Sequence, residues 1–321
     1  MSDQEIYDLI IIGGGPGGLS AGIYAIRAAL NTVLVEKGVT GGQLTLTDEV
    51  ENYPGFENIT GFELSQKLTQ HAQSYGLEMI TQEVLAVEPG LEFHTVKLTN
   101  GDSLKAYAII LGTGGSPRKL NVPGEEAYYG KGVSYCAVCD GFFFKNKTVA
   151  VIGGGDTAAE EALYLSKLCE QVYLVHRRDA LRAGMILQQR VKAECKIDIL
   201  WDTIVTAIKA NGEGVSGVDL KDTQTGEERE LTVDGAFVFI GFDPNNQLVP
   251  AGTKMNTDGY VVTDEKCATS IPGIYAIGDL REKYARQIVT AAADGCTAAL
   301  AVAHYVETKK APADVCELPL E

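Results

Sequence analysis

Residues 6–18 read Ile-Tyr-Asp-Leu-Ile-Ile-Ile-Gly-Gly-Gly-Pro-Gly-Gly. The run 6–12 is apolar and rich in β-branched side chains, which predicts a buried parallel strand. The glycines that follow have the spacing G-x-G-x-x-G, and a helix of small residues is expected to begin near Leu19. A second predicted strand, 32–35, ends in Glu36. This order is typical of a dinucleotide site, in which the helix N-terminus receives the pyrophosphate and the acid accepts the ribose hydroxyls. A tight structural turn is the alternative.

The same pattern returns in the second half of the chain. A predicted strand over 147–152 leads into the glycine turn 153–158, a helix to 167 and a strand over 171–175. At the offset where the first copy has Glu36, the second has His176-Arg177-Arg178, with Arg182 a turn later. A carboxylate favours a free 2′-hydroxyl, whereas guanidinium groups favour a 2′-phosphate. The first site is therefore predicted to hold FAD or NAD and the second NADPH, unless the basic run is only a solvated helix start.

Between the two fingerprints lies Cys136-Ala137-Val138-Cys139-Asp140-Gly141. This spacing allows a small disulfide ring and a reactive thiolate, and Asp140 can exchange the proton that thiol–disulfide exchange requires. Half of a zinc site is one alternative, but the other cysteines stand alone and no histidine lies at ligand spacing from them. Two inert buried thiols are the second alternative. We predict a redox-active pair and no metal.

Composition places limits on the class of protein. A chain of 321 residues with 45% hydrophobic content suits two domains, and a net charge of −16 argues against nucleic acid or an anionic membrane as partner. The acidic start lacks the features of a signal peptide, and no apolar run approaches the roughly 18 residues needed to cross a bilayer. Seven cysteines with one close pair do not indicate a secreted disulfide framework. We expect a cytoplasmic protein.

The remaining segments complete the predicted organisation. Strands are expected at 197–200, 203–209, 216–222 and 230–233, forming a smaller sheet, and flexible joints at 112–117 and 241–245. The short strand before Gly278-Asp279 can aim a carboxylate at the hydroxyls of a sugar or ribityl chain. An amphipathic helix is predicted at about 286–307. Since the cysteine pair precedes the second fingerprint closely, it belongs to the NADPH domain, and the two domains must rotate between two arrangements if both electron transfers use one region of the flavin.

Taken together, these residues closely resemble the low-molecular-weight, bacterial-type thioredoxin reductases over essentially the whole chain. The segments that carry the resemblance are 13–18, 40–43, 51–55, 113–114, 136–141, 153–158, 176–182, 278–279 and 286–287. Two departures are visible. Gly112 stands where the family commonly has alanine, and Val138 stands between the cysteines where threonine is frequent.

The resemblance implies an α/β fold with two Rossmann-like nucleotide-binding domains, each with a parallel central sheet and a smaller antiparallel sheet in three layers. An NADPH-binding domain, 116–245, would be inserted into a discontinuous FAD-binding domain, 1–115 and 246–321, and the protein would be a homodimer. Cys139 would face the flavin, Cys136 would attack the partner disulfide, and Asp140 would be the acid/base. Asp279 would meet the ribityl chain, with Arg286 and Gln287 along the flavin ring.

The catalytic residues that follow are Cys136, Cys139 and Asp140. The predicted cofactor-binding residues are Gly13, Gly15, Pro16, Gly17, Glu36, Lys37, Gly41, Gly42, Gln43, Leu44, Asn52, Val84, Gly112, Thr113, Gly114, Gly278, Asp279, Arg286, Gln287, Ile288, Gly153, Gly155, Asp156, Thr157, His176, Arg177, Arg178 and Arg182.

The implied reaction moves electrons from NADPH through FAD and the Cys136–Cys139 disulfide to the disulfide of thioredoxin. Three alternatives remain. The first is the flavoprotein reductase of another thioredoxin-like or peroxiredoxin partner, such as an alkyl hydroperoxide system. The second is a dithiol oxidase that passes electrons to oxygen. The third, of a different class, is a non-catalytic nucleotide-sensing protein.

Overall fold

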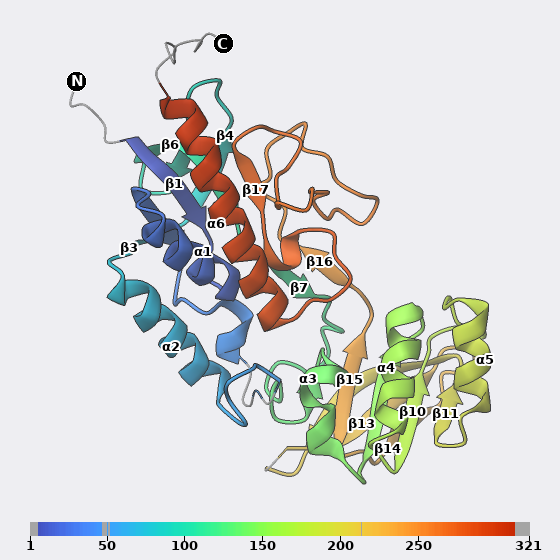
Figure 1. The fold of residues 1–321 in the computed structure, drawn as a ribbon. Helices are drawn as coiled ribbons and strands as arrows, with labels where there is room; N and C mark the ends of the chain where they lie inside the picture. Colours follow the sequence, from blue (N-terminus) through green and yellow to red (C-terminus); the bar gives the residue numbers. More distant parts are fainter. Residues whose placement is uncertain (1–5, 47–49, 51, 213, 312–321) are drawn as a thin grey trace, which may run out of the picture.

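The computed structural model describes residues 6–46, 50, 52–212 and 214–311. Figure 1 shows two lobes, each built around a sheet with helices packed beside it. The first lobe contains the N-terminal strands and the last helix, and the second lobe is made from the middle of the chain. This arrangement, in which one Rossmann-like unit interrupts another, confirms the predicted α/β fold class.

The central sheet of the first lobe has seven strands, in the order β3-β2-β1-β6-β5-β4, with β17 also paired to β6. The carboxyl-terminal half of β6 pairs in parallel with both β1 and β17, so the chain returns to this sheet after building the second lobe. The strands are β1 (Ile6–Ile12), β2 (Thr32–Glu36), β3 (Glu78–Thr81), β4 (Val84–Glu88), β5 (His94–Leu98), β6 (Ser103–Leu111) and β17 (Ile274–Ala276).

Three helices cover this sheet: α1 (Pro16–Arg27), α2 (Gly61–Ser74) and α6 (Ile288–Lys310). α1 begins at Pro16 rather than near Leu19, because proline suits the first helical position and the glycines after it are needed for packing. A Cβ added at Gly295 of α6 would lie 2.0 Å from the carbonyl oxygen of Gly17. The two helix backbones therefore meet directly, and the glycines belong inside the helix.

The predicted absence of an apolar stretch of bilayer length is wrong for α6. By length and composition alone this helix could cross a membrane. One such helix is weak support for a membrane span, since core helices meet the same criterion, and here the helix packs along α1 (Figure 1). Its alanine-rich sequence reflects that close packing.

The second lobe contains a parallel five-stranded sheet, in the order β11-β10-β9-β15-β8, and an antiparallel three-stranded sheet, β12-β13-β14. Its helices are α3 (Ala137–Asp140), α4 (Asp156–Ser166) and α5 (Met185–Ala193). Its strands are β8 (Val133–Ser134), β9 (Thr148–Gly153), β10 (Gln171–Val175), β11 (Ile197–Leu200), β12 (Thr203–Ala210), β13 (Val215–Asp222), β14 (Glu228–Leu231) and β15 (Gly235–Phe239).

One strand lies in a different sheet from the one expected. The segment 197–200 was predicted with the smaller sheet, but β11 pairs in parallel with β10. The reason is that α5 lies between the two strands and acts as a crossover, which returns the chain to the same parallel sheet.

The two predicted joints lie against each other. β7 (Gly115–Pro117) and β16 (Phe242–Pro244) form an antiparallel pair between the lobes (Figure 1). Asn245 reinforces it: its side-chain amide donates to the carbonyl of Thr113 (2.9 Å), and its backbone carbonyl accepts from the Thr113 hydroxyl (2.7 Å). The connection is thus a two-stranded ribbon held by hydrogen bonds rather than two loose loops.

Candidate active site

The first glycine turn follows β1 and begins α1. Gly13 has φ 107°, and a Cβ there would lie 2.3 Å from the carbonyl oxygen of Gly112. A Cβ at Gly18 would lie 1.9 Å from the carbonyl oxygen of Gly13. Gly15, in contrast, has no heavy atom within 4 Å of the place a Cβ would take. Two glycines therefore let backbones touch, and the third leaves room for a ligand.

Glu36, at the end of β2, points back to this turn. Its Oε2 accepts from the Gly14 amide (2.7 Å) and its Oε1 from the Gly38 amide (3.1 Å). Each oxygen of a carboxylate can accept a second hydrogen bond, so the fixed carboxylate can still accept ribose hydroxyls. The geometry fits the role that the sequence predicts.

The loop after β2 supplies a further wall. Asn52 Nδ2 donates to Gln287 Oε1 (3.4 Å), and the side chain of Gln43 donates to the Gly115 carbonyl. Gly41 lies behind this wall, because its amide donates to the Gly14 carbonyl (2.7 Å) and a Cβ there would meet Ser65. Glu51, part of the same predicted motif, lies outside the described residues.

Two buried polar atoms at the far end of the cavity have no hydrogen-bond partner among the described residues: Oδ1 of Asp279, in the 3₁₀ turn Gly278–Leu280, and Nε of Arg286. Burial raises the pKa of Asp279, while Lys283 and then Arg286 oppose that rise. The Arg286 guanidinium stacks 4.3 Å from the centre of the Tyr260 ring. An acceptor and a donor left unpaired in a cavity fit a polar ligand such as a flavin nucleotide.

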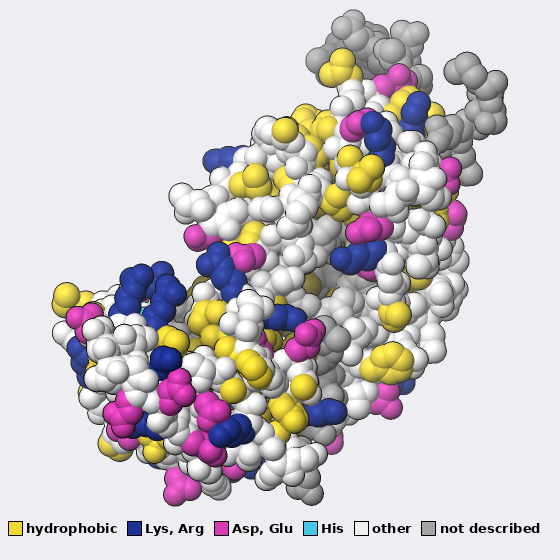
Figure 2. All heavy atoms as spheres, turned by 180° about the vertical axis from the view of Figure 1, so that it is seen from behind, with side chains coloured by type: hydrophobic (Ala, Val, Ile, Leu, Met, Phe, Trp, Pro, Cys, Tyr) yellow, Lys and Arg dark blue, Asp and Glu magenta, His cyan; other side chains and the backbone are white. Residues whose placement is uncertain are grey.

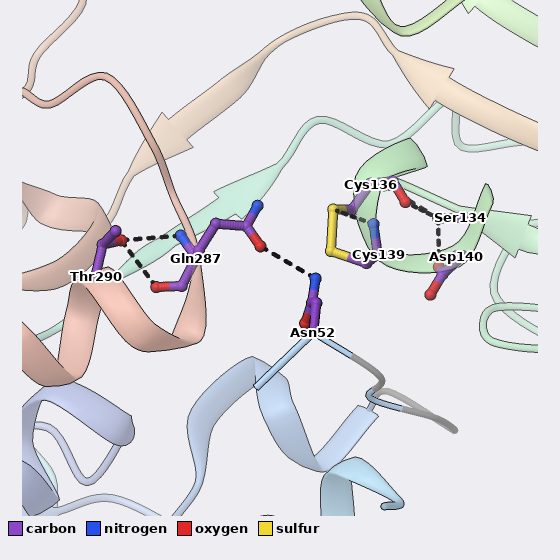
Figure 3. Close-up of a disulfide and its surroundings, with 7 residues drawn as sticks. All are labelled: Asn52, Ser134, Cys136, Cys139, Asp140, Gln287 and Thr290. Atoms are coloured by element: carbon purple, nitrogen blue, oxygen red, sulfur yellow. Dashed lines mark hydrogen bonds between the residues drawn. A yellow bond between two sulfur atoms is a disulfide. The ribbon is translucent and has the colours of Figure 1, made fainter. Parts of the chain in front are cut away.

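Cys136 and Cys139 form a disulfide, with Cys136 as N-cap of the short helix α3. The Cys139 amide donates to the Cys136 sulfur (3.2 Å), a contact that favours a thiolate at Cys136 once the bond is opened. Figure 3 shows the sulfurs on the side of α3 that faces Asn52 and Gln287. The redox pair of one lobe therefore faces the predicted flavin site of the other.

Asp140, at the end of α3, is held by Ser134. The Ser134 hydroxyl donates to Asp140 Oδ2 (2.5 Å), and the Ser134 Oγ accepts from the Cys136 amide (3.0 Å). One serine thus fixes the carboxylate and the start of the cysteine ring together (Figure 3). Sequence reasoning missed Ser134, because a serine two residues before a cysteine carries no signal of its own.

The second glycine turn joins β9 to α4. A Cβ at Gly153 would lie 2.5 Å from the Phe239 carbonyl oxygen, whereas Gly155 has open space. Asp156 Oδ1 accepts from the Gly184 amide (2.7 Å), which ties the turn to the start of α5. The Arg182 amide donates to the Gly154 carbonyl (2.7 Å). The basic segment therefore lies against the turn, as a dinucleotide phosphate site requires.

The four residues of the basic group differ in their surroundings. Arg177, Arg178 and Arg182 are exposed, and Figure 2 shows basic side chains gathered beside the hollow between the lobes. His176 is only 5% exposed, and its ring nitrogens lie 2.8 Å from the Gly153 carbonyl oxygen and 3.0 Å from that of Ala180. Both nitrogens face backbone carbonyls, so in this arrangement the His176 ring supports the turn, and its predicted part in cofactor binding stays a prediction.

A cavity of about 1620 Å³ connects these parts. Cys136, Cys139 and Asp140 line it. All predicted cofactor residues line it except Gly41, Gly153, Asp156, His176, Arg177 and Arg178. The predicted FAD residues and the disulfide thus share one space, while most of the basic group lies outside it. The binding roles of the individual residues remain predictions.

Other polar side chains of this region escaped the sequence analysis. Only the structure shows that Glu161 and Tyr260 are buried here. Only the structure shows that Lys283 and Asp294 form an ion pair. Within the part of the chain that the structure describes, no group of three or more His, Cys, Asp or Glu side chains is placed to hold a metal ion. Cys316, one of the lone cysteines, lies outside that part.

Residues 7–295 match the family described as pyridine nucleotide-disulphide oxidoreductase. The chain belongs to that family. The pyridine nucleotide-disulphide oxidoreductases thus include this protein over nearly all of its length, and the predicted recognition is confirmed at the level of the family.

Individual relatives of the same family are more specific. The chain is 47% identical to a thioredoxin reductase of Bacillus subtilis over 307 residues, which covers 96% of this chain and 97% of that one. It matches the crystal structure of thioredoxin reductase from Streptococcus pyogenes with a TM-score of 0.91 at 42% identity. It matches a Lactococcus lactis thioredoxin reductase, in the FR conformation, with a TM-score of 0.65 at 43% identity. Both structures cover 94% of this chain and are themselves covered to 99%.

Proposed function

We propose that this chain is an NADPH-dependent thioredoxin-disulfide reductase, which moves electrons from NADPH through FAD and the Cys136–Cys139 disulfide to the disulfide of thioredoxin. The observation that carries the proposal is the disulfide itself, on the wall of the cavity that the first fingerprint, Glu36 and Asp279 also line. Membership of the family by itself indicates only an oxidoreductase. The position of the disulfide on the wall of the predicted flavin cavity supports the route proposed for the electrons.

The cofactors are FAD and NADPH. Gly13, Gly15 and Glu36 would hold the adenosine diphosphate portion of FAD, and Asp279 and Arg286 would lie at the flavin end. Arg177, Arg178 and Arg182 would hold the 2′-phosphate of NADPH. When bound, FAD supplies two-electron transfer between the nicotinamide and the disulfide.

The residues of this chain then carry out thiol–disulfide exchange. The reaction consumes NADPH, one proton and the thioredoxin disulfide, and gives NADP⁺ and two thiols on thioredoxin. Cys136 attacks a thioredoxin sulfur, and Cys139 resolves the mixed disulfide. Asp140, held by Ser134, gives or takes the proton at the leaving sulfur.

Domain boundaries and domain movement belong to the same proposal. Residues 1–115 and 246–321 would bind FAD and 116–245 would bind NADPH, with rotation about the β7–β16 ribbon. Two relatives of nearly equal identity support movement, because the TM-score to one is 0.91 and to the other 0.65 over the same share of the chain. Both relatives differ from this chain in sequence by nearly the same amount, so a different arrangement of the two lobes would account for the lower score.

The protein is further proposed to act as a homodimer in the cytoplasm, without nucleic acid or membrane as partner. The net charge of −16 supports the last two points.

An anaerobic titration tests the function. NADPH should bleach the flavin absorbance of the purified protein and NADH should do so poorly, after which thioredoxin should restore the yellow form. Cys136→Ser should abolish thioredoxin reduction while NADPH still bleaches the flavin. The exposed Cys195 offers the matched control, and Cys195→Ser should behave as the parent protein does. A colourless protein, or retained thioredoxin turnover in Cys136→Ser, would contradict the proposal, and peroxide formed from small dithiols without NADPH would favour an oxidase.

A further inference from the structure

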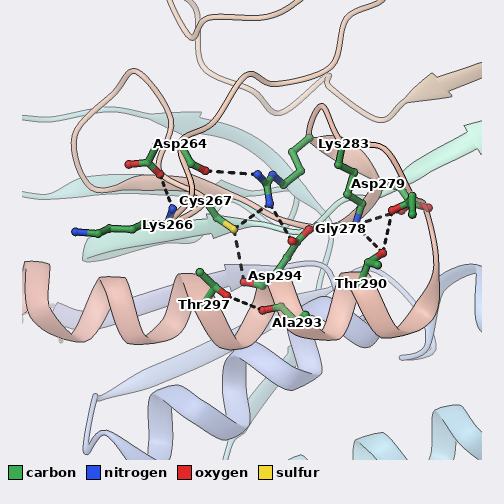
Figure 4. Close-up of polar contacts among 12 residues, drawn as sticks. Asp264, Lys266, Cys267, Gly278, Asp279, Lys283, Thr290, Ala293, Asp294 and Thr297 are labelled. Atoms are coloured by element: carbon green, nitrogen blue, oxygen red, sulfur yellow. Dashed lines mark hydrogen bonds and ion pairs between the residues drawn. The ribbon is translucent and has the colours of Figure 1, made fainter. Parts of the chain in front are cut away.

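A cluster of buried charged side chains lies behind the predicted flavin end of the cavity (Figure 4). Lys283, Asp294, Asp279 and Arg281 come from the 3₁₀ turn Gly278–Leu280, the segment after it and α6. The Lys283 and Asp294 side chains are only 10% and 12% exposed. Charges taken out of water in this way must be balanced by close partners.

The Asp294 carboxylate accepts hydrogen bonds from two cationic side chains and from one backbone amide. Its Oδ2 accepts from the Lys283 ammonium (3.1 Å) and from the Gly278 amide (3.0 Å), and its Oδ1 accepts from Arg281 (2.9 Å). Arg281 and Lys283 together bring two positive charges to the single negative charge of this carboxylate. The positive charge of Lys283 therefore remains available to a second acid.

That second acid is Asp279. Its Oδ1 lies 3.9 Å from the Lys283 nitrogen, which is close enough for attraction but too far for a hydrogen bond. The same oxygen is buried and has no hydrogen-bond donor among the described residues. Lys283 thus supports the charge of Asp279 from its buried side, while the carboxylate side chain keeps 26% of its surface exposed and lines the cavity.

We propose that Lys283 is a positioning residue for the flavin nucleotide: its ammonium group, held between Asp294 and Asp279, balances both carboxylates, so that Asp279 presents an ionised acceptor to hydroxyl groups of the cofactor. This inference rests on FAD as the cofactor of the proposed function. Arg281 and the Gly278 amide hold Asp294 in place, and Asp294 in turn holds Lys283.

The other groups that face Asp279 are consistent with this role. Arg286, from the following loop, also lowers the pKa of Asp279, and Asp294 on α6 raises it. Tyr260 lies buried beneath the Arg286 guanidinium, and burial raises the pKa of its phenol, to which Asp279 adds a smaller rise. Arg286 is engaged with the Tyr260 ring, so Lys283 is the cation that stands between the two acids.

FAD binding to the deflavinated protein, followed by fluorescence quenching across a pH series, tests the proposal without any measurement of activity. Lys283→Met should weaken FAD binding, by up to about tenfold for each unit by which the pKa of Asp279 rises, once the pH lies below that pKa. The loss should grow as the pH falls, because the pKa of Asp279 rises without the ammonium and the carboxyl takes up a proton. Lys283→Arg should restore most of the affinity. Lys97→Met, which removes an exposed lysine paired with Glu88, is the matched control and should bind as the parent protein does.

Asp294→Asn separates this role from simple support of the fold. It should lower the thermal unfolding temperature of the FAD-free protein while FAD affinity is kept, because the amide oxygen of asparagine can still accept from Lys283, whose charge then serves Asp279 alone. Two outcomes would overturn the proposal. One is that Lys283→Met and Asp294→Asn lose FAD affinity equally and in proportion to the fall in their unfolding temperatures. The other is that the loss of affinity in Lys283→Met does not change with pH. If Lys283→Met does not fold, Lys283→Gln takes its place, and its FAD affinity and unfolding temperature are compared with those of Asp294→Asn. Should the parent protein itself bind no FAD, the proposed function fails before this inference is reached.

Discussion

At the residue scale, the proton chemistry beside the disulfide depends on one pair. Asp140 can hold a proton for the thiols because the Ser134 hydroxyl fixes its carboxylate 2.5 Å away. We predict that Asp140→Asn slows thioredoxin reduction by roughly 10²–10⁴, the range that loss of a general acid or base gives. The flavin should still be bleached by NADPH. Ser134→Ala, which leaves the carboxylate but frees it, should cost less, and stopped-flow measurement of both steps gives the comparison. Equal rates in Asp140→Asn and the parent protein would remove Asp140 from the mechanism.

A second residue, Glu161 on α4, makes stability depend on pH. Burial raises the pKa of Glu161 from 4.5 to about 7, Glu160 adds to the rise, and the amide of Ala137 opposes it. Between these two values the folded chain binds more protons than the unfolded chain, so this group makes stability fall as pH rises through that window.

Glu161→Gln should therefore be more stable than the parent above the upper end of the window. The gain should be about 1 kcal/mol, since partial exposure screens the effect. Below the ordinary pKa of the acid the two proteins should be alike, because both side chains are then neutral. Urea unfolding at both ends of the window measures this. Glu170→Gln, at an exposed position, is the control for loss of one negative charge. A gain that is the same at both ends would mean that the pKa of Glu161 does not differ between the folded and the unfolded chain.

The sequence was sufficient to identify residues whose chemistry depends on their spacing along the chain. It was not sufficient for residues whose role depends on burial in the folded protein. The cysteines and the acid at the end of β2 could be named because their neighbours along the chain define them. His176 stood in the right segment, but only the fold shows that both ring nitrogens face carbonyls. Glu161 and Lys283 had no pattern at all, since their partners come from distant parts of the chain or from the way a turn is packed.

At the element scale, the contact between α1 and α6 decides how closely the first fingerprint is held. A Cβ at Gly295 would lie 2.0 Å from the Gly17 carbonyl oxygen and 2.9 Å from the Ala21 amide nitrogen, and neither backbone atom can move alone. We predict that Gly295→Ala destabilises the protein by about 1–3 kcal/mol, the usual cost of overpacking, despite the better helix propensity of alanine. FAD affinity should fall with it, because α1 carries the glycine turn.

Gly38→Ala is the matched control for that substitution, because no heavy atom lies within 4 Å of its added Cβ. Chemical unfolding of the two variants, with and without FAD, gives the measurement. If Gly295→Ala were as stable as the parent, the two helices would have to separate easily, and the glycines of α1 would owe their presence to the ligand alone.

The elements themselves were predictable where their periodicity is strong. β1, β10 and the strands of the antiparallel sheet lie within a few residues of their expected positions. The sheet to which β11 belongs could not be predicted, because a short strand with alternating apolar residues suits a parallel or an antiparallel neighbour equally well. Only the crossover through α5 chooses between them. The start of α1 failed for a related reason: glycines that break most helices are retained here for contact with α6.

At the scale of the whole molecule, the proposed function implies that the lobes take two arrangements, if both electron transfers use one region of the flavin. In the arrangement described, Cys136 and Cys139 line the cavity of the predicted flavin site, while Arg177 and Arg178 lie outside it. This favours exchange between flavin and disulfide over hydride transfer from a nucleotide held by the basic group. The β7–β16 ribbon is the place where the lobes can turn, because it is the hydrogen-bonded connection between them.

We therefore predict that a bismaleimide crosslink between cysteines engineered on the two lobes, which fixes this arrangement, blocks repeated turnover and spares one half-reaction. Flavin reduced by light should still reduce the Cys136–Cys139 disulfide in the crosslinked protein, whereas NADPH should no longer bleach the flavin at its normal rate. Cys195, Cys296 and Cys316 are first replaced by serine, because Cys195 is exposed, Cys296 is half-buried and Cys316 lies outside the described residues. Cys169 and Cys267 are buried and the native pair is oxidised, so the reagent then finds the introduced thiols. The same variant treated with a monofunctional maleimide keeps its freedom to turn and should retain full thioredoxin turnover. Normal turnover in the crosslinked protein would show that a single arrangement suffices, and the exposed basic group would then have to reach the flavin cavity without rotation of the lobes.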